Sequence, residues 1–248
     1  MAAFQRLGLL SACRTRHNTK LDSAAAERLG CMDIAIQIPG VKLGLVEAYE
    51  VRVELVHPAL AVEMDAVCDR IRRSHTVEQV AQLQSVRDVR AMFRAWGVDP
   101  SRYRPSAEAL LRRVVQGKGL YRISNVVDVC NLCSIETGWP IGLYDRANLA
   151  PPISFRLGTA GESYVGIGKQ TWHLAGRPVL ADSRGPFGSP ISDSTRTMIT
   201  EATQSVLTMI FAPLHASEAL LQHAVEQYAS RLERFASACA TRVAVILP

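Results

Sequence analysis

The most informative stretch of this chain runs from Asn125 to Asp145 and reads Asn-Val-Val-Asp-Val-Cys-Asn-Leu-Cys-Ser-Ile-Glu-Thr-Gly-Trp-Pro-Ile-Gly-Leu-Tyr-Asp. Asn125 is predicted to be a helix N-cap, because its side-chain oxygen can accept from the free amides of a first turn. The apolar residues that follow recur at close to helical spacing. Gly138 is predicted to end the helix in the left-handed conformation, and Pro140 prevents it from resuming.

Two polar residues lie on this mostly apolar helix. Asp128 and Asn131 are three apart and therefore share one helix face. Buried polar groups need hydrogen-bond partners, so either internal bonds tie the helix to a sheet or the two side chains contact a ligand. Together with Asn125 they are candidate binding residues.

Composition places the chain among ordinary globular proteins. With 248 residues, 48% of them hydrophobic, it is long enough for one core of normal size. No apolar run is long enough for a transmembrane helix, so we expect no membrane partner. Six cysteines form no disulfide framework, and Cys130 and Cys133 are predicted to be buried packing residues in a reducing, cytoplasmic protein.

Net charge is distributed unevenly along the chain. The formal charge is +5, and residues 1–31 contribute +3 through five basic and two acidic residues. The rest is therefore only weakly basic, which is little evidence for a nucleic-acid partner. Residues 1–31 show no sustained period and no secretory segment, since Leu7–Leu10 is too short an apolar run. We expect a loose extension over 1–31 and a single domain over 32–248.

Local patterns predict a mixed succession of helices and strands. Thr76 and Gln79 form a capping box that starts one of the helices. Blocks of helices and antiparallel strands indicate the α+β class. Helices are expected at 58–73, 76–96, about 106–115, 125–137 and 215–238, and strands within 34–56 and at 153–157, 164–167, 178–181, 195–199, 203–211 and 243–247.

The central stretch resembles a known family. Val-Val-Asp-Val-x-Asn, followed by Gly-x-Pro and Tyr-Asp, is similar to the B3/B4 editing module of the bacterial phenylalanyl-tRNA synthetase beta chain, which also occurs in small free-standing proteins. A second similar piece runs from Asp182 to Leu207, and together the pieces cover about residues 101–213. The resemblance implies a B3/B4-like fold, an antiparallel or mixed sheet with packed helices, and tRNA or aminoacyl-tRNA as partner.

At two positions the sequence departs from the family. The synthetase module hydrolyses tyrosine wrongly esterified to tRNA, using a histidine shortly after Gly-x-Pro and a glutamate after Thr-x-Asn-Val-Leu. Gly142 and Met209 occupy these positions here. A second alignment, which matches Thr195 to the family threonine, places Glu201 at the glutamate position.

A pocket is still predicted beside the Gly-rich turn 184–189. Backbone amides of such a turn can hold an anion or a developing oxyanion. Asp193 and Glu201 are the candidate catalytic residues, to bind the amino group of an aminoacyl ester or to orient a water. The alternative is that residues 193–195 only cap a turn. The candidate binding residues are Asn125, Asp128, Asn131, Arg184, Gly185, Phe187, Ser194, Thr195 and Arg196.

The sequence contains no motif for nucleotide binding, serine-nucleophile catalysis or metal-dependent catalysis. There is no P-loop, dinucleotide fingerprint, nucleophile elbow or zinc-helix pattern, so no metal and no organic cofactor is implied. Two functions are left open. One is an aminoacyl-tRNA deacylase acting in trans, which does not charge tRNA itself, and the other is a non-catalytic module that binds RNA or an amino-acid-like ligand. The long C-terminal helix either forms a homodimer or covers the domain's own sheet.

Overall fold

The computed structural model describes residues 14–18 and 32–248 and confirms the α+β class. The described helices are α2 (Pro58–Ser74), α3 (Val77–Val80), α4 (Gln84–Ala95), α5 (Ser106–Val115), α6 (Asn125–Thr137) and α7 (Glu218–Ala236), with the 3-10 turns η1 (Arg146–Asn148) and η2 (Thr195–Thr197). The described strands are β1 (Arg14–Asn18), β2 (Ile34–Ile36), β3 (Val41–Tyr49), β4 (Ile141–Asp145), β5 (Ile153–Leu157), β6 (Ser163–Val165), β7 (Thr171–His173), β8 (Pro178–Asp182), β9 (Gly185–Gly188), β10 (Ser205–Pro213) and β11 (Ala240–Ile246).

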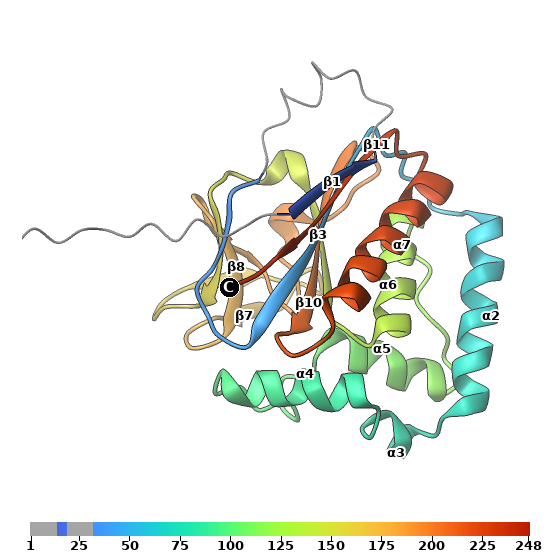
Figure 1. The fold of residues 1–248 in the computed structure, drawn as a ribbon, viewed down its shortest axis with the longest axis horizontal. Helices are drawn as coiled ribbons and strands as arrows, with labels where there is room; N and C mark the ends of the chain where they lie inside the picture. Colours follow the sequence, from blue (N-terminus) through green and yellow to red (C-terminus); the bar gives the residue numbers. More distant parts are fainter. Residues whose placement is uncertain (1–13, 19–31) are drawn as a thin grey trace, which may run out of the picture.

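Five strands form the larger sheet, in the order β1-β11-β3-β10-β4, and every neighbouring pair is antiparallel. β3 and β10 pair along their whole lengths at its centre. Helices α6 and α7 lie on one face of this sheet (Figure 1). Gly44 of β3 allows α7 to approach closely, because a Cβ there would lie 2.7 Å from Val225 Cγ1.

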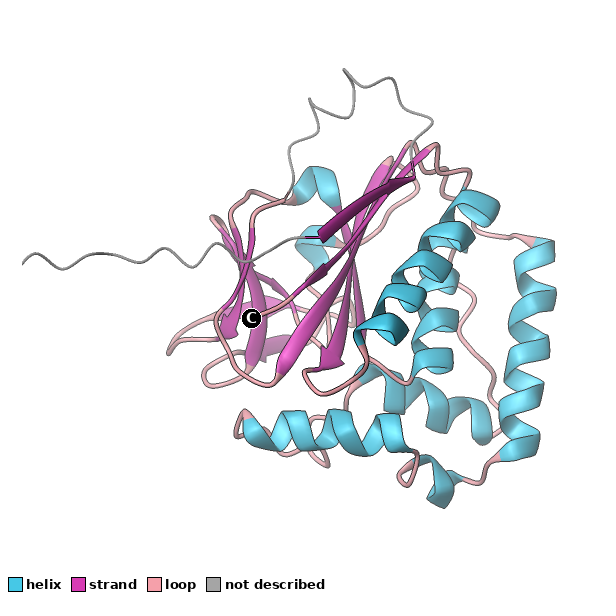
Figure 2. Ribbon diagram, in the orientation of Figure 1, coloured by secondary structure: helices cyan, strands magenta, loops and turns pink. Residues whose placement is uncertain are grey.

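The smaller sheet, in the order β2-β5-β8-β9, lies on the other side of the larger one (Figure 2). Aromatic rings join the two sheets. Phe155 of β5 lies 5.0 Å from Phe211 of β10, and Phe187 of β9 meets Tyr144 of β4 edge-on at 4.9 Å between centroids. The core therefore has two layers, one between the sheets and one between the larger sheet and the helices.

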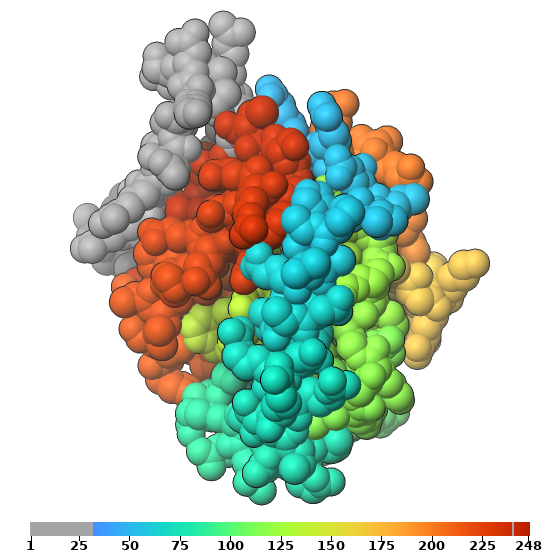
Figure 3. Space-filling view, turned by 90° about the vertical axis from the view of Figure 1, so that its right-hand side faces the viewer, coloured from blue at the N-terminus to red at the C-terminus, as the bar shows by residue number. Residues whose placement is uncertain are grey.

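Helix α2 packs outside α7, and the two lie side by side in Figure 3. Glu63 of α2 accepts from Arg231 of α7 at 2.9 Å and from Arg234 at 3.1 Å. On α7, Leu232 is buried against the domain, whereas Leu220 is 60% exposed. The helix therefore covers its own sheet. Cys130 and Cys133 are buried, which confirms the packing role expected for them.

The central helix is where predicted, with a different cap. Ser124 is the N-cap, because its Oγ accepts from the Val127 amide at 3.5 Å, and Asn125 is the first helical residue. The prediction of Asn125 as N-cap was wrong, since its side chain binds other backbone groups. Gly138 ends the helix at φ 70°, as expected.

Three other local predictions were wrong. The helix expected over 76–96 is divided into α3 and α4 by a turn at 81–83, although the capping box of Thr76 and Gln79 is present. Residues 51–55 belong to no strand, because the Val51 amide bonds to Gln204 and the Arg52 amide to Ala236 at the end of α7. Residues 195–197 form η2 in place of a strand.

The N-terminal region contains one strand that its weak pattern did not indicate. Residues 14–18, expected in a loose extension, form β1 and pair with β11 at the edge of the larger sheet. The other expectations for residues 1–31, including the Leu7–Leu10 run, lie outside the described residues. Within the described part of the chain, no helix is long and apolar enough to cross a membrane.

Candidate functional site

The side chain of Asn125 forms hydrogen bonds inside the domain. Its amide donates to the carbonyls of Arg52 at 2.9 Å and Phe235 at 2.7 Å, and its oxygen accepts from the Glu54 amide at 2.9 Å. These bonds join the start of α6 to the segment before α2 and to the end of α7. The side chain is thereby saturated by backbone groups, which is the structural alternative expected for the polar residues of this helix.

Asp128 and Asn131 differ in their surroundings. Asp128 accepts from the Ile123 amide at 3.0 Å, which fixes the entry into α6. Burial raises the pKa of Asp128, although the Ile123 amide and the Arg122 guanidinium oppose this. Asn131 is half-buried, and no hydrogen bond of its side chain is found among the described residues. Among the described residues, Asn131 is therefore the polar residue of this helix whose side-chain amide has no hydrogen bond and can bind a ligand.

Arg196 stabilises the turn between β8 and β9. Its guanidinium forms two 3.0 Å bonds to the carboxylate of Asp182 and one of 3.1 Å to the Gly185 carbonyl. Burial alone would raise the pKa of Asp182, but the Arg196 guanidinium and two backbone amides hold it below its ordinary value. Arg184 donates its amide to Asp182 at 2.9 Å and its guanidinium to the Asn148 carbonyl. Arg184, Gly185 and Arg196 therefore shape one turn.

Ser194 and Thr195 hold a short helical turn in place. Ser194 is the N-cap of η2, and its Oγ accepts from the Arg196 amide at 3.0 Å. Thr195 donates its hydroxyl to the Val165 carbonyl at 3.2 Å. The Ser194 hydroxyl is used as expected for a residue that caps a turn, whereas the Thr195 hydroxyl joins this turn to β6.

The carboxyl group of Asp193 is buried and contacts the side chain of Tyr144 on β4. Tyr144 Oη donates to Asp193 Oδ1 at 2.9 Å, and the Ser189 amide donates to the same oxygen at 3.4 Å. Burial raises the pKa of Asp193 to about 7, although these donors pull it down. Burial and the neighbouring Asp193 together raise the pKa of Tyr144. This pair is the most strongly perturbed acid and hydroxyl close to the candidate residues.

The positions at which the resemblance implies a histidine and, in one of its two alignments, a glutamate lie opposite each other in the structure. Gly142 of β4 lies opposite Met209 of β10 in the sheet register. The Tyr144 side chain folds over this place, so a Cβ at Gly142 would overlap Tyr144 Oη, and a Cβ at Gly188 would overlap the same ring. The Tyr144 ring therefore fills the space next to Gly142.

Sequence reasoning missed Tyr144. Its signal was the strand pattern of 141–145, which places Gly142 and Tyr144 on the same face. Glu201 lies in an exposed turn before β10, and no contact joins it to Asp193. The structure thus brings Asp193 and Phe187 together around Tyr144, holds Arg184, Gly185 and Arg196 around Asp182, and leaves Glu201 apart.

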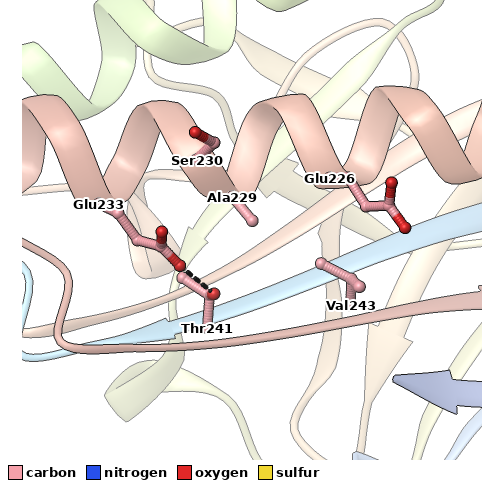
Figure 4. Close-up of a pocket in the computed structure, with 6 residues that line it drawn as sticks. All are labelled: Glu226, Ala229, Ser230, Glu233, Thr241 and Val243. Atoms are coloured by element: carbon pink, nitrogen blue, oxygen red, sulfur yellow. Dashed lines mark hydrogen bonds between the residues drawn. The ribbon is translucent and has the colours of Figure 1, made fainter. Parts of the chain in front are cut away.

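Two cavities lie elsewhere on the molecule. One of about 130 Å³ is lined by side chains of α7 and β11, where Thr241 donates to Glu233 at 2.6 Å (Figure 4). The other, of about 420 Å³, lies near the end of α6 and is bordered by Arg70, His75 and Glu136. Neither is lined by a candidate residue. In the described part of the chain, no group of three or more His, Cys, Asp or Glu side chains is arranged to hold a metal ion.

Comparison with known proteins finds relatives of one kind. The phenylalanine–tRNA ligase beta subunit of Streptomyces avermitilis is 31% identical over 164 residues, which cover 61% of this chain and 19% of that protein. The same subunit of Pasteurella multocida is 32% identical over 127 residues, which cover 47% of this chain and 15% of that protein. The chain thus spans less than a fifth of the length of these relatives.

Solved structures and a family model also match. An N-terminal fragment of the phenylalanyl-tRNA synthetase beta subunit from Pyrococcus horikoshii aligns with a TM-score of 0.38 and 14% identity, over 82% of this chain and 49% of that one. The model of the B3/4 domain matches residues 88–245, a range that includes 101–213. Because this match covers well over half of the chain, the protein belongs to the B3/4 domain family.

Proposed function

We propose that this chain is a tRNA-binding module without the hydrolytic activity of a synthetase editing site. Its membership of the B3/4 family supports tRNA as the partner, since its relatives are phenylalanine–tRNA ligase subunits by name. One observation carries the loss of hydrolysis. The ring of Tyr144 fills the space beside Gly142 and Met209, where the resemblance would place a histidine and a glutamate.

The scatter of the candidate polar groups supports the same proposal. Asn125 and Asp128 are bound to backbone groups at the start of α6, and Glu201 lies in an exposed turn. Ester hydrolysis needs an attacking water and a charge-stabilising donor held around one carbonyl carbon. These groups do not converge in that way. This proposal includes a cytoplasmic location, because the relatives are tRNA ligase subunits by name and tRNA is charged in the cytoplasm.

A second candidate function is hydrolysis of an aminoacyl-tRNA ester in trans, and Asp193 favours it. Its carboxyl group has a pKa of about 7 and lies beside the Tyr144 hydroxyl. A carboxylate titrating near neutrality can take a proton from water as that water attacks the ester carbonyl. The bond to the ribose oxygen then breaks, and the proton passes to that oxygen. Products are a free amino acid and an uncharged tRNA.

One experiment separates the two functions. Purified protein is mixed with a panel of radiolabelled aminoacyl-tRNAs, and both retention of tRNA on a filter and release of amino acid are measured. We expect retention without release, unchanged in Asp193→Asn and in the exposed control Glu201→Gln. Release of one amino acid that is lost only in Asp193→Asn would establish the hydrolase instead. If neither retention nor release occurs, both functions are rejected.

A further inference from the structure

The positive charge of this chain is concentrated in its helical region. Residues 58–122, which contain α2 to α5, hold twelve lysines and arginines against seven acidic residues. This excess of five equals the formal net charge of the whole chain, so the remaining segments cancel one another. A positive field that gathers on one part of the surface attracts anionic partners to that part.

Within this region, three arginines surround one buried carboxylate. Glu108 of α5 is only 1% exposed. Its oxygens lie 2.9 Å from Arg112 Nε, 3.1 Å from Arg90 Nε and 3.8 Å from Arg104 Nε. Glu108 balances one of the three charges, and Glu78 of α3 is close enough to Arg112 for their charges to attract, so the arginine cluster formed by Arg90, Arg104 and Arg112 keeps a local positive excess.

The pairing inside the arginine cluster is incomplete. Glu108 Oε2 and Arg90 Nε are buried and lie 3.1 Å apart as an ion pair, but this contact lacks hydrogen-bond geometry, and neither atom has another hydrogen-bond partner among the described residues. Guanidinium groups held this close repel one another, and the repulsion is stronger in a partly desolvated place than in water. A second anion would relieve it. Arg104, whose side chain is 45% exposed, is the member of the cluster that a ligand can reach from solvent.

The cluster lies next to the candidate site. The first amide of α5, that of Ser106, donates to the Pro190 carbonyl at 3.2 Å, and Pro190 belongs to the loop that carries Asp193. Pro105, the N-cap residue, offers no capping side chain, and Glu108 in the first turn partly offsets the positive end of the helix dipole beside Arg104. An anion bound here would lie close to the Asp193 loop.

Two tyrosines in the segments that flank α5, the half-buried Tyr103 and the exposed Tyr121, indicate which polyanion fits. Arg113 of α5 places its guanidinium 3.9 Å from the ring centroid of Tyr121, which is exposed. Arg177 stacks in the same way on Tyr103, the neighbour of Arg104, at 4.0 Å. Nucleic-acid bases stack on tyrosine rings and on arginine planes, and arginine forks match phosphate oxygens. Acidic peptides have phosphate-like charge but no flat bases.

We propose that the arginine cluster of Arg90, Arg104 and Arg112 binds the phosphodiester backbone of an RNA strand. The strand passes the start of α5 and leads toward the Asp193 loop. This proposal takes the identity of the partner, RNA, from the proposed function. The site itself is carried by the buried Glu108, the three guanidiniums around it and the bond between Ser106 and Pro190.

The test uses Arg104→Gln in the full chain. Arg104 is the most exposed member of the cluster and its 3.8 Å pair with Glu108 is the longest, so the change should leave the fold intact. Arg104→Lys retains the charge. Arg73→Gln, on the exposed surface of α2 and outside the cluster, removes the same charge and is the matched control. Circular dichroism and melting temperature confirm folding of each variant.

The readout is the affinity for fluorescein-labelled single-stranded RNA and for tRNA over a series of salt concentrations. We expect Arg104→Gln to weaken binding by about 3- to 10-fold at low salt and to reduce the slope of log K against log salt by about 0.7. Arg104→Lys should restore the slope, and Arg73→Gln should change the affinity less than about two-fold.

Each other outcome overturns a defined statement. If Arg104→Gln and Arg73→Gln weaken RNA binding equally, the arginine cluster is not the phosphate site, while tRNA binding still stands. If the unmodified protein binds no RNA, the proposed function fails together with this one. If a polyglutamate peptide of equal charge binds as tightly and loses affinity in the same variant, the partner is an acidic peptide and the RNA assignment is rejected.

Discussion

The carboxyl group of Asp193 holds its proton to a higher pH in the folded protein than in the unfolded chain. Its pKa is about 7 in the fold, against 3.8 for an ordinary aspartate. The folded state therefore binds this proton at pH values where the unfolded state has lost it. The stabilising contribution is fully present below about pH 4 and is lost as the pH rises through about 7.

This linkage is testable with Asp193→Asn. The free energy of unfolding of the unmodified protein should fall, relative to that of the variant, by on the order of 2–4 kcal/mol between pH 4 and pH 8. Urea titrations at a series of pH values measure the difference. The asparagine side chain also changes the hydrogen bonds at this position, but that effect on the free energy of unfolding is the same at every pH and does not alter its pH dependence. Parallel pH profiles of the two proteins would contradict the raised pKa.

Single residues were predictable only where local chemistry decides their role. Gly138 needed a left-handed C-cap, and its position was expected from sequence. The perturbed pair of Asp193 and Tyr144 joins residues 49 positions apart, and no local pattern contains that contact. Asn125 was selected correctly as a polar residue needing partners, but three distant backbone groups provide them.

At the scale of elements, the contact between α7 and β3 depends on Gly44. A Cβ at this position would lie 2.7 Å from Val225 Cγ1, 2.8 Å from Leu221 Cδ1 and 3.3 Å from Ile210 Cβ. Gly44→Ala should therefore destabilise the protein by about 1–3 kcal/mol, because the helix has to move away from the sheet. Guanidinium unfolding midpoints measure the loss.

Gly168→Ala is the matched control, since no atom lies within 4 Å of the added Cβ. It should leave the midpoint nearly unchanged. Equal midpoints for the two variants would show that the helix and the sheet adjust to the extra methyl group without cost.

Periodic elements were predicted better than short ones. The helices at 58–74 and 218–236 and the central helix follow from apolar spacing over three turns or more. The division between α3 and α4 lacks a proline or glycine to indicate it. Thr195 and Thr197 carry β-branched side chains typical of a strand, yet the Ser194 cap and the Arg196 pair with Asp182 favour a 3-10 turn over residues 195–197.

The molecule as a whole has one large contiguous core. Buried residues from Met32 to Ile246 belong to it, and a small satellite cluster lies under β6 and β7. This supports our proposal that residues 32–248 form a single domain. Beyond that core, β1 completes the sheet by pairing five residues with β11. Without β1, the backbone groups of β11 would face solvent along an open edge.

Removal of residues 1–31 tests the contribution of β1. We expect the shortened chain to be less stable by about 1–3 kcal/mol, because the five cross-strand pairs are lost. It should also self-associate with rising concentration through the open edge, which light scattering after gel filtration detects. A variant lacking only residues 1–13 keeps β1 and is the control. Identical stability and mass for the two shortened chains would rule out the role assigned to β1.

The pairing of β1 with β11 also brings Arg14 close to the last strand of the chain. Arg14 lies opposite Val245 on neighbouring antiparallel strands, which are about 5 Å apart. A few flexible residues are enough to join these two points covalently once residues 1–13 are removed. New termini opened in the exposed turn at Gly161 would then give a circularly permuted protein that keeps every strand pair of the larger sheet.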